Sequence, residues 1–198
     1  MAEKTTEVKE RLLISREKYL SSGVHIGMTF KTADMKRFIY KIRPNGLAVL
    51  NIGTLDERIR YTSKMLANKE RILIVTKRES GFEAIKKFCD VVNAKSVLGR
   101  FMPGSLTNPT YKNFMEAEVL IILDPLHDKQ AIKEAVQMRT PIIGIADTSN
   151  ETSFIDIVLP ANNKAKKSIA LIFWLLAREI MKIRGEEFKY ELKDFGFE

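Results

Sequence analysis

Short, strongly apolar runs alternate along this chain with longer segments in which apolar side chains recur at helical spacing. The runs occupy residues 71–76, 96–98, 118–123, 141–146 and 154–159. Continuous apolar runs of this length are typical of parallel strands that are buried on both faces. Helical spacing is found in the segments that begin near residues 54, 80, 128 and 165. The alternation predicts an α/β fold with a mainly parallel sheet and helices on both of its faces.

The N-terminal quarter follows a different pattern. Apolar residues at near-helical spacing predict a helix over residues 7–21, ended by Gly23. Residues 37–50 alternate with a period of two around a Pro-Asn-Gly turn, which predicts a β-hairpin. We expect Phe38 and Tyr40 on one face of this hairpin and most of its cations on the other.

Three local expectations complete the picture. Thr54 and Glu57 have the spacing of a capping box, so a helix is expected to open at Thr54. Residues 111–117 are interpreted as a short helix. Gly144 lies inside an apolar run, where the simplest interpretation is close packing of a helix against the strand.

Composition favours one globular domain. The 198 residues are 45% hydrophobic and 29% charged, enough for one substantial core. We divide the chain into an N-terminal helical extension (1–18), one α/β domain (19–185) and an acidic, aromatic tail (186–198).

Cys89 is the single cysteine, so the chain has neither a disulfide framework nor a cysteine-based zinc site, which fits a reducing, cytoplasmic setting. The most apolar run, residues 169–177, is far shorter than the roughly 20 residues that a membrane helix needs.

Charge shifts the interpretation toward a polyanion partner. The net charge is +8 and the isoelectric point about 9.5, and the tail from residue 186 carries five acids against two lysines, which leaves +11 on residues 1–185. One cationic cluster spans thirteen positions and comprises Lys31, Lys36, Arg37, Lys41 and Arg43. The second comprises Lys164, Lys166 and Lys167. This second cluster stands at a helix start, where cations are unfavourable unless an anion partner is bound, and Asn162 and Asn163 add neutral donors beside it.

Residues 99–109 form a loop rich in glycine and proline in the middle of the chain. Its two glycines have the spacing of a phosphate-binding P-loop, but Ser105 occupies the position of the required lysine and Pro103 lacks a backbone N–H, so we exclude that motif. We expect the loop to follow a strand near the middle of the sheet, beside the ligand crevice. Two interpretations stand: a plain connection, or contact with folded RNA through Arg100 and Asn108.

No catalytic constellation is recognisable. Neither His25 nor His127 has a nucleophile beside it in the sequence, and the dinucleotide fingerprint is absent. Asp124 and Asp128 flank His127 in a pattern that would suit a metal, but a strand end and a helix cap explain them better. Asp147 and the threonine after it suit either a ribose hydroxyl or a loop cap. We expect no catalytic residue, no metal and no cofactor.

Several motifs, in a fixed order, resemble the small-subunit ribosomal protein S-two family, whose eukaryotic members are called protein SA or laminin-receptor precursor. They are YLSSGVHIG at residues 19–27, GRFMPGSLTNP at 99–109, and then DPLHDKQAIKEA, TPIIGIADT and IDIVLPANNKAKKSIALIFWLLAREIMKIRG. The bacterial helical insertion is missing after the Thr-Asn element, and Met28 replaces a histidine of many bacterial members. Together with the short tail, this resembles the archaeal type.

The resemblance implies a Rossmann-like or flavodoxin-like three-layer sandwich that is a structural constituent of the small ribosomal subunit. It implies binding to ribosomal RNA near the head–body junction, a role in subunit assembly and translation, and no enzyme activity. A nucleotide-binding α/β enzyme is the alternative, and a module that binds an acidic partner without RNA is a second one.

The partners expected are small-subunit ribosomal RNA and neighbouring ribosomal proteins, the latter through residues 186–198. We expect a monomer outside the ribosome, in the cytoplasm, with no membrane contact. The residues expected to contact RNA phosphates are Lys31, Lys36, Arg37, Lys41, Arg43, Arg100, Lys164, Lys166 and Lys167. Those expected to shape loops or donate hydrogen bonds at the interface are Gly23, His25, Gly27, Asn108, Asn162 and Asn163.

Overall fold

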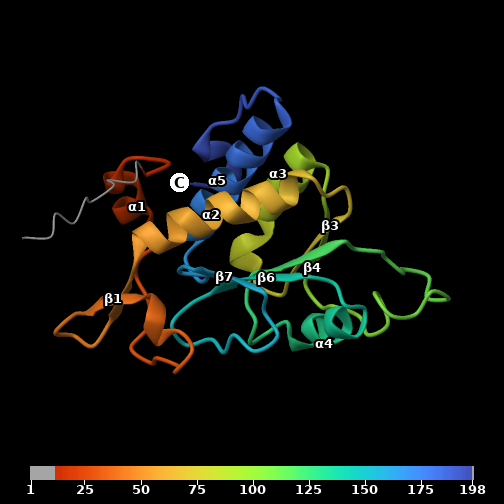
Figure 1. The fold of residues 1–198 in the computed structure, drawn as a ribbon, viewed down its shortest axis with the longest axis horizontal. Coiled ribbons are helices and arrows are strands. Elements are labelled where there is room, and N and C mark those ends of the chain that lie inside the picture. The colour runs from red at the N-terminus through yellow and green to blue at the C-terminus, as the bar shows by residue number, and fades with distance from the viewer. Residues whose placement is uncertain (1–11, 198) are drawn as a thin grey trace, which may run out of the picture.

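A computed structural model describes residues 12–197 of the chain. Its centre is a five-stranded sheet with the order β4-β3-β5-β6-β7, in which every neighbouring pair is parallel (Figure 1). The strands are β3 (Ile72–Thr76), β4 (Lys95–Leu98), β5 (Val119–Ile122), β6 (Ile142–Ala146) and β7 (Ile157–Pro160). In chain order β3 is the first strand of this sheet, and it lies between the second, β4, and the third, β5, as in flavodoxin-like folds. The predicted fold class is confirmed.

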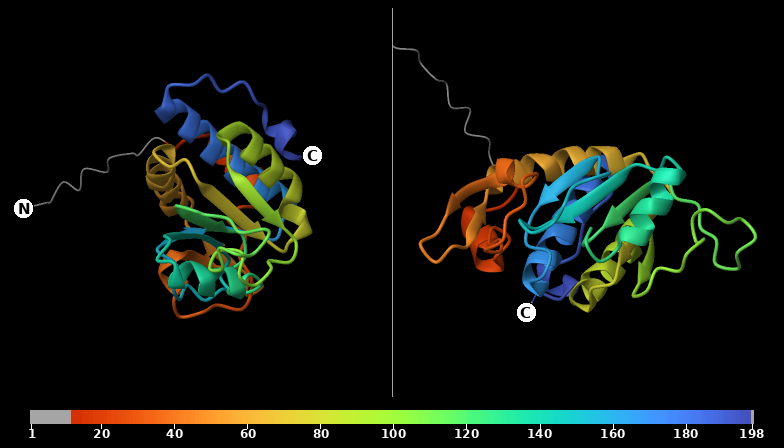
Figure 2. Two further views of the ribbon diagram at one scale, coloured as in Figure 1. Left: turned by 90° about the vertical axis from the view of Figure 1, so that its right-hand side faces the viewer. Right: turned by 90° about the horizontal axis from the view of Figure 1, so that it is seen from below.

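Helices cover both faces of the sheet (Figures 1 and 2). The first face carries α2 (Ile52–Ala67), α3 (Phe82–Val92, preceded by the 3-10 turn η2, Glu79–Gly81) and α5 (Lys166–Arg184). The second carries α4 (Lys129–Gln137). Alternate residues of β3 serve the two layers: Ile72 and Ile74 pack in the larger core, Leu73 and Val75 under α4. The result is the predicted three-layer sandwich.

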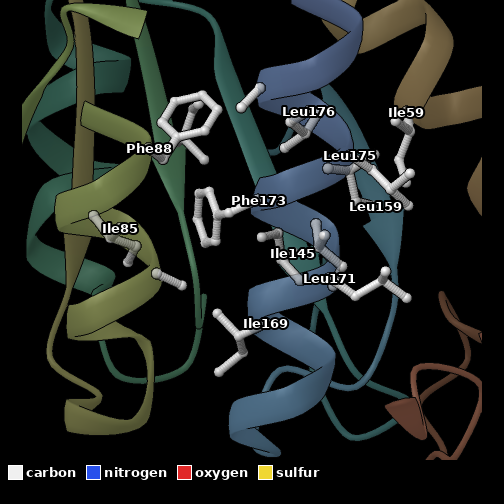
Figure 3. Packing of buried hydrophobic residues seen from close by; sticks show 14 of the residues in the cluster. Ile59, Ile85, Phe88, Ile145, Leu159, Ile169, Leu171, Phe173, Leu175 and Leu176 are labelled. Atoms are coloured by element: carbon white, nitrogen blue, oxygen red, sulfur yellow. The ribbon is translucent and has the colours of Figure 1, made fainter. Parts of the chain in front are cut away.

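The larger core is organised around α5, which is buried along most of its length. Figure 3 shows Phe173 of α5 pointing toward Phe88 of α3, while Leu175 points toward Ile59 of α2. The two phenylalanine rings meet edge to face, with centroids 5.3 Å apart. The expectation that this apolar helix is covered on more than one side is therefore confirmed.

The N-terminal part forms a two-stranded arm beside the sheet. It contains α1 (Arg16–Ser22), the 3-10 turn η1 (Lys36–Phe38), and the antiparallel strands β1 (Ile39–Ile42) and β2 (Ala48–Leu50). The hairpin is confirmed, but the two-faced division of its residues is wrong. Phe38 is buried in η1, whereas Tyr40 is 67% exposed and Lys41 is exposed as well. The successive residues Tyr40, Lys41 and Ile42 of β1 are all exposed, so both faces of this strand meet solvent.

Four further local expectations are wrong. The helix expected from residue 7 begins at Arg16 within the described residues, and residues 7–11 lie outside them. Helix α2 begins ahead of Thr54, because Asn51 caps it by accepting the N–H of Gly53 at 3.0 Å. Residues 111–117 form turns rather than a helix. A Cβ on Gly144 would lie 2.8 Å from Cδ1 of Ile155, so a loop and not a helix packs on this glycine.

The C-terminal residues return to the domain. The 3-10 turn η3 (Leu192–Phe195) lies against α3 and α5, and Phe195 is fully buried in the larger core. Trp174 of α5 donates from Nε1 to the carbonyl of Tyr190 at 3.1 Å. Of the helices described, none is long and apolar enough to cross a membrane.

Candidate nucleic-acid interface

The loops that follow the five parallel strands meet at one edge of the sheet. The strand order reverses between β3 and β5, which is the usual ligand crevice of such sheets. Here the crevice holds the carboxylate of Asp124, which is 1% exposed. Its Oδ2 accepts from Nε of Arg78 at 2.6 Å and contacts Nδ1 of His127 at 2.9 Å, while its Oδ1 accepts from Asn150 at 2.9 Å. The protein's own polar groups therefore fill the crevice.

Two carboxyl groups in this crevice have shifted pKa values of opposite sign. Burial opposes ionisation of Asp124, but the hydrogen bond and charge of Arg78 outweigh it and lower its pKa. Burial first, and then the charge of Asp124, raise the pKa of Asp128 to about 6. Oδ2 of Asp128 is buried and has no hydrogen-bond partner among the described residues. Within the same part of the chain, no group of three acidic, histidine or cysteine side chains is arranged to hold a metal.

Two asparagines connect this crevice to the N-terminal arm. The Asn163 amide is buried and donates to the carbonyls of Leu123 and Ile145 at 3.1 and 3.3 Å. Asn162 donates to the carbonyl of Gly23 at 3.3 Å and accepts from two N–H groups at the start of α5. These hydrogen bonds tie the segment after β7 to the end of α1 and to the ends of β5 and β6.

The loop over residues 23–28 fits tightly against the strand ends. Gly23 closes α1 with a φ of 71°, which favours glycine. Gly27 lies against Thr148, where a Cβ would be 2.6 Å from Cγ2, and Oγ1 of Thr148 accepts the N–H of Met28 at 2.8 Å. His25 is buried beside them. These contacts seat the arm beside β7.

The hairpin presents the first cationic cluster to solvent. Lys36, Arg37, Lys41 and Arg43 are exposed and form no ion pair with any residue from 12 to 197. Lys31 differs, because it is half-buried and donates to the carbonyl of Gly46 at 3.1 Å.

The second cluster is engaged within the protein. Lys166 pairs with Glu83 at 2.8 Å, and Lys164 lies 3.5 Å from Asp147. Nζ of Lys167 is 5.9 Å from the ring centroid of Phe197. Two acids and an aromatic ring of the same chain therefore lie beside the three lysines at this helix start.

Arg100 and Asn108 lie at the other end of the molecule. The loop over residues 99–109 follows β4, which is an edge strand, so its predicted position near the middle of the sheet is wrong. β4 and the arm next to β7 are at opposite ends of the sheet (Figure 2). The buried carboxylate of Glu134 accepts the N–H groups of Gly104 and Leu106 at 2.8 and 3.1 Å. The loop is therefore fastened to α4, while both predicted contact residues remain exposed.

Sequence reasoning missed two residues that the fold adds to the hairpin cations. Arg16 on α1 and Tyr40 on β1 line one groove together with His25, Lys41 and Arg43. Arg16 is remote from the cationic cluster in sequence, so no local pattern singles it out. Period-two alternation places Tyr40 on an apolar face, and the position of this aromatic residue next to Lys41 is the signal that could have found it.

The sequence is similar to that of known ribosomal proteins over most of its length. The family model described as ribosomal protein S2 matches residues 19–117 and 111–182. The small ribosomal subunit protein uS2 of Picrophilus torridus is 45% identical over 195 residues, covering 95% of this chain and 98% of that protein. The uS2 of Thermoplasma volcanium gives the same identity and coverage. That of Thermoplasma acidophilum is 46% identical over 193 residues, covering 94% and 97%.

Proposed function

Because the chain belongs to the ribosomal protein S2 family, we propose that it is a structural constituent of the small ribosomal subunit that binds ribosomal RNA through its N-terminal arm. The relatives carry the name of a small-subunit protein and match nearly the whole chain, which supports a shared role. The role includes support of subunit assembly and translation, at a position near the head–body junction.

The arm carries this proposal. Among its exposed cations, Lys36, Arg37, Lys41 and Arg43 form no ion pair with any residue in the described part of the chain. Phosphate contacts supply most of the sequence-independent affinity for nucleic acid, and folded RNA is recognised largely through shape and backbone. A narrow strand pair with cations on exposed surfaces suits insertion between RNA backbones.

The nucleotide-binding enzyme is the weaker alternative on two structural grounds. The crevice at the strand switch holds Asp124, a negative group that would repel a phosphate, with Arg78 already paired to it. Two N–H groups of the loop after β4 are accepted by Glu134. The groups that usually bind a phosphate are thus committed to the protein itself.

The C-terminal residues are proposed as the contact with neighbouring ribosomal proteins. Phe195 is buried in the domain, so the groups that remain for a basic neighbour are exposed acids, including Glu186, Glu187 and Glu191. This contact would be electrostatic and sensitive to salt.

Sedimentation of a cell lysate tests the proposed function. The full chain is expected to travel with the small subunit in a density gradient at physiological salt. Recovery only in the soluble fraction would overturn the proposal. A triple variant, Arg37→Gln, Lys41→Gln and Arg43→Gln, is expected to shift protein toward the soluble fraction. The matched control removes three exposed cations elsewhere, by Lys86→Gln, Lys129→Gln and Lys133→Gln, and should sediment like the unmodified chain.

A further inference from the structure

A groove lies between α1 and the β1–β2 hairpin, with the first turn of α2 beside it. Its volume is ≈ 470 Å³, within the range of sites that hold small organic ligands. Arg16 comes from α1, and Tyr40, Lys41 and Arg43 from the hairpin, so the groove exists only because the two elements fold together.

The electrostatics of the groove favour an anion. Arg16, Lys41 and Arg43 line it, the lining includes no acid, and none of the three cations has an ion pair with a described residue. Helix α2 begins there, at Asn51 and Ile52, so its positive end adds to the same field.

His25, in the wall of this groove, carries a buried ring nitrogen without a hydrogen-bond partner. His25 is 5% exposed, and its Nδ1 has no hydrogen-bond partner among the described residues. Burial, and then the charge of Arg43, lower the pKa of His25, so the imidazole is neutral near pH 7. A buried polar atom without a partner is rare in native proteins, and this one belongs to a residue that lines the groove.

Tyr40 adds a recognition element that a bare phosphate does not need. Its side chain is 67% exposed and comes from the strand that also carries Lys41. Exposed aromatic rings next to cations are the means by which proteins stack unpaired bases while holding the phosphate. Leu12 and Leu20 give the groove an apolar portion that suits a base or sugar.

We propose that this groove binds one unstacked nucleotide of RNA, with the base on Tyr40, the phosphate between Arg16, Lys41 and Arg43, and a polar edge of the ligand at His25. The inference rests on the proposed RNA-binding function and narrows it. Most phosphate contacts of the arm are indifferent to base pairing, whereas this groove requires a nucleotide that has left the helix stack.

Two RNA probes test the requirement for an unstacked base. One is a fully paired RNA stem-loop, and the other is the same stem with a single-nucleotide bulge. The full-length protein is expected to bind the bulged stem at least about five-fold more tightly, and Tyr40→Ala should remove that preference, since one stacked base contributes a factor of this size or larger. Tyr61→Ala is the matched control, because Tyr61 is an exposed tyrosine on α2 outside the groove. Equal binding of the two stems by the unmodified chain would overturn the inference.

Small probes separate a nucleotide site from an anion site. Adenosine 5′-monophosphate is expected to shift the NMR signals of both Tyr40 and His25, and adenosine alone to shift them less. Sodium phosphate that reproduces the whole effect would show a simple anion site and contradict the inference.

His25→Gln, which keeps hydrogen-bonding capacity, should weaken binding of the monophosphate less than His25→Phe does.

The two levels of the proposal fail differently. If the chain does not sediment with the small subunit, the proposed function fails whatever the groove binds. If it sediments normally but Tyr40→Ala leaves the preference for the bulged stem unchanged, only the nucleotide site fails.

Discussion

The guanidinium of Arg78 and the carboxylate of Asp124 join the carboxyl ends of β3 and β5, with Nε of Arg78 2.6 Å from Oδ2 of Asp124. This is the point at which related folds bind a ligand. In this chain an ion pair between a part-buried arginine and a buried carboxylate stands there, so the crevice stabilises the domain, and the exposed arm is the surface that we propose for RNA.

Loss of Arg78 should destabilise the domain strongly. Arg78→Ala leaves the buried Asp124 charge with weaker partners, and we expect the free energy of unfolding to fall by roughly 2–4 kcal/mol. Urea unfolding at pH 7 measures this. Arg71→Ala is the control, since Arg71 pairs with Glu116 at the surface and should cost less than about 1 kcal/mol. Equal losses in the two variants would refute the structural role of the Arg78 pair.

The buried Asp128 should make stability fall as the pH rises. Its pKa is raised to about 6 in the folded protein, from an ordinary value near 3.8, so the folded state holds this proton more tightly than the unfolded state. The contribution is therefore favourable at low pH, is lost between about pH 4 and 6, and is absent at pH 7.

Asp128→Asn isolates this effect. The variant carries no charge at this position, so it should be more stable than the unmodified chain at pH 7, by roughly 1–3 kcal/mol. The difference should shrink steadily toward pH 4.5, as measured by urea unfolding at each pH. A difference that does not change with pH would contradict the assignment.

Gly27 should not tolerate a side chain. In Gly27→Ala the new Cβ would lie 2.6 Å from Cγ2 of Thr148, so the loop must move, at a cost of roughly 1–3 kcal/mol. Thermal unfolding checks the loss. Gly53→Ala serves as the control, because a Cβ there makes only an ordinary contact, 3.4 Å from Oδ1 of Asn51, and a helical position favours alanine. A stable Gly27→Ala variant would argue against the tight seating of the arm.

The salt dependence of RNA binding should distinguish the two cationic clusters. The logarithm of the binding constant falls as the logarithm of the salt concentration rises, and each phosphate that a cation neutralises makes this slope steeper by about 0.7 to 0.9. Neutralising Arg37, Lys41 and Arg43 is therefore expected to make the slope shallower by about 2 to 3. Neutralising Lys164, Lys166 and Lys167 should reduce it less, because Lys164 and Lys166 already lie beside acids of the chain. Filter binding of small-subunit ribosomal RNA at several salt concentrations measures both. An unchanged slope in the first variant would remove the arm from the interface.

Phe195 should be a stabilising core residue although it lies three positions from the C-terminus. The side chain is fully buried against α3 and α5, so Phe195→Ala should lower the free energy of unfolding by about 3–5 kcal/mol. Phe154→Ala, at a 72% exposed position, should change it by less than about 0.5 kcal/mol. Similar losses in both variants would show that the C-terminal residues do not complete the core.

The strands and the main helices were predictable because burial leaves a periodic trace in the sequence. The apolar run that ends at Leu123 forms β5, in which every residue is buried. The long apolar helix predicted for residues 165–184 is observed over Lys166–Arg184. Boundaries failed where a single side chain decided them. Asn51 caps α2 ahead of the predicted Thr54, and helical periodicity does not determine which polar residue before a helix caps it.

The candidate site was predictable only in part, because the sequence shows where cations are but not which of them are paired. The cations of the hairpin are close in sequence, so their density was visible without a structure. Whether a cation is free depends on partners that are remote in sequence. Lys166 is paired with Glu83 and Lys31 with the carbonyl of Gly46, while Lys41 and Arg43 have no such partner among the described residues.

Local residue order thus sufficed for the α/β class, the basic character and the family, since periodicity, charge and motifs are properties of neighbouring positions. The filled crevice of Arg78 and Asp124, the edge position of the loop after β4, and the groove between Arg16 and Tyr40 came from the packed molecule. Each of them depends on how strands or helices far apart in the chain pack together, and no local pattern encodes that packing.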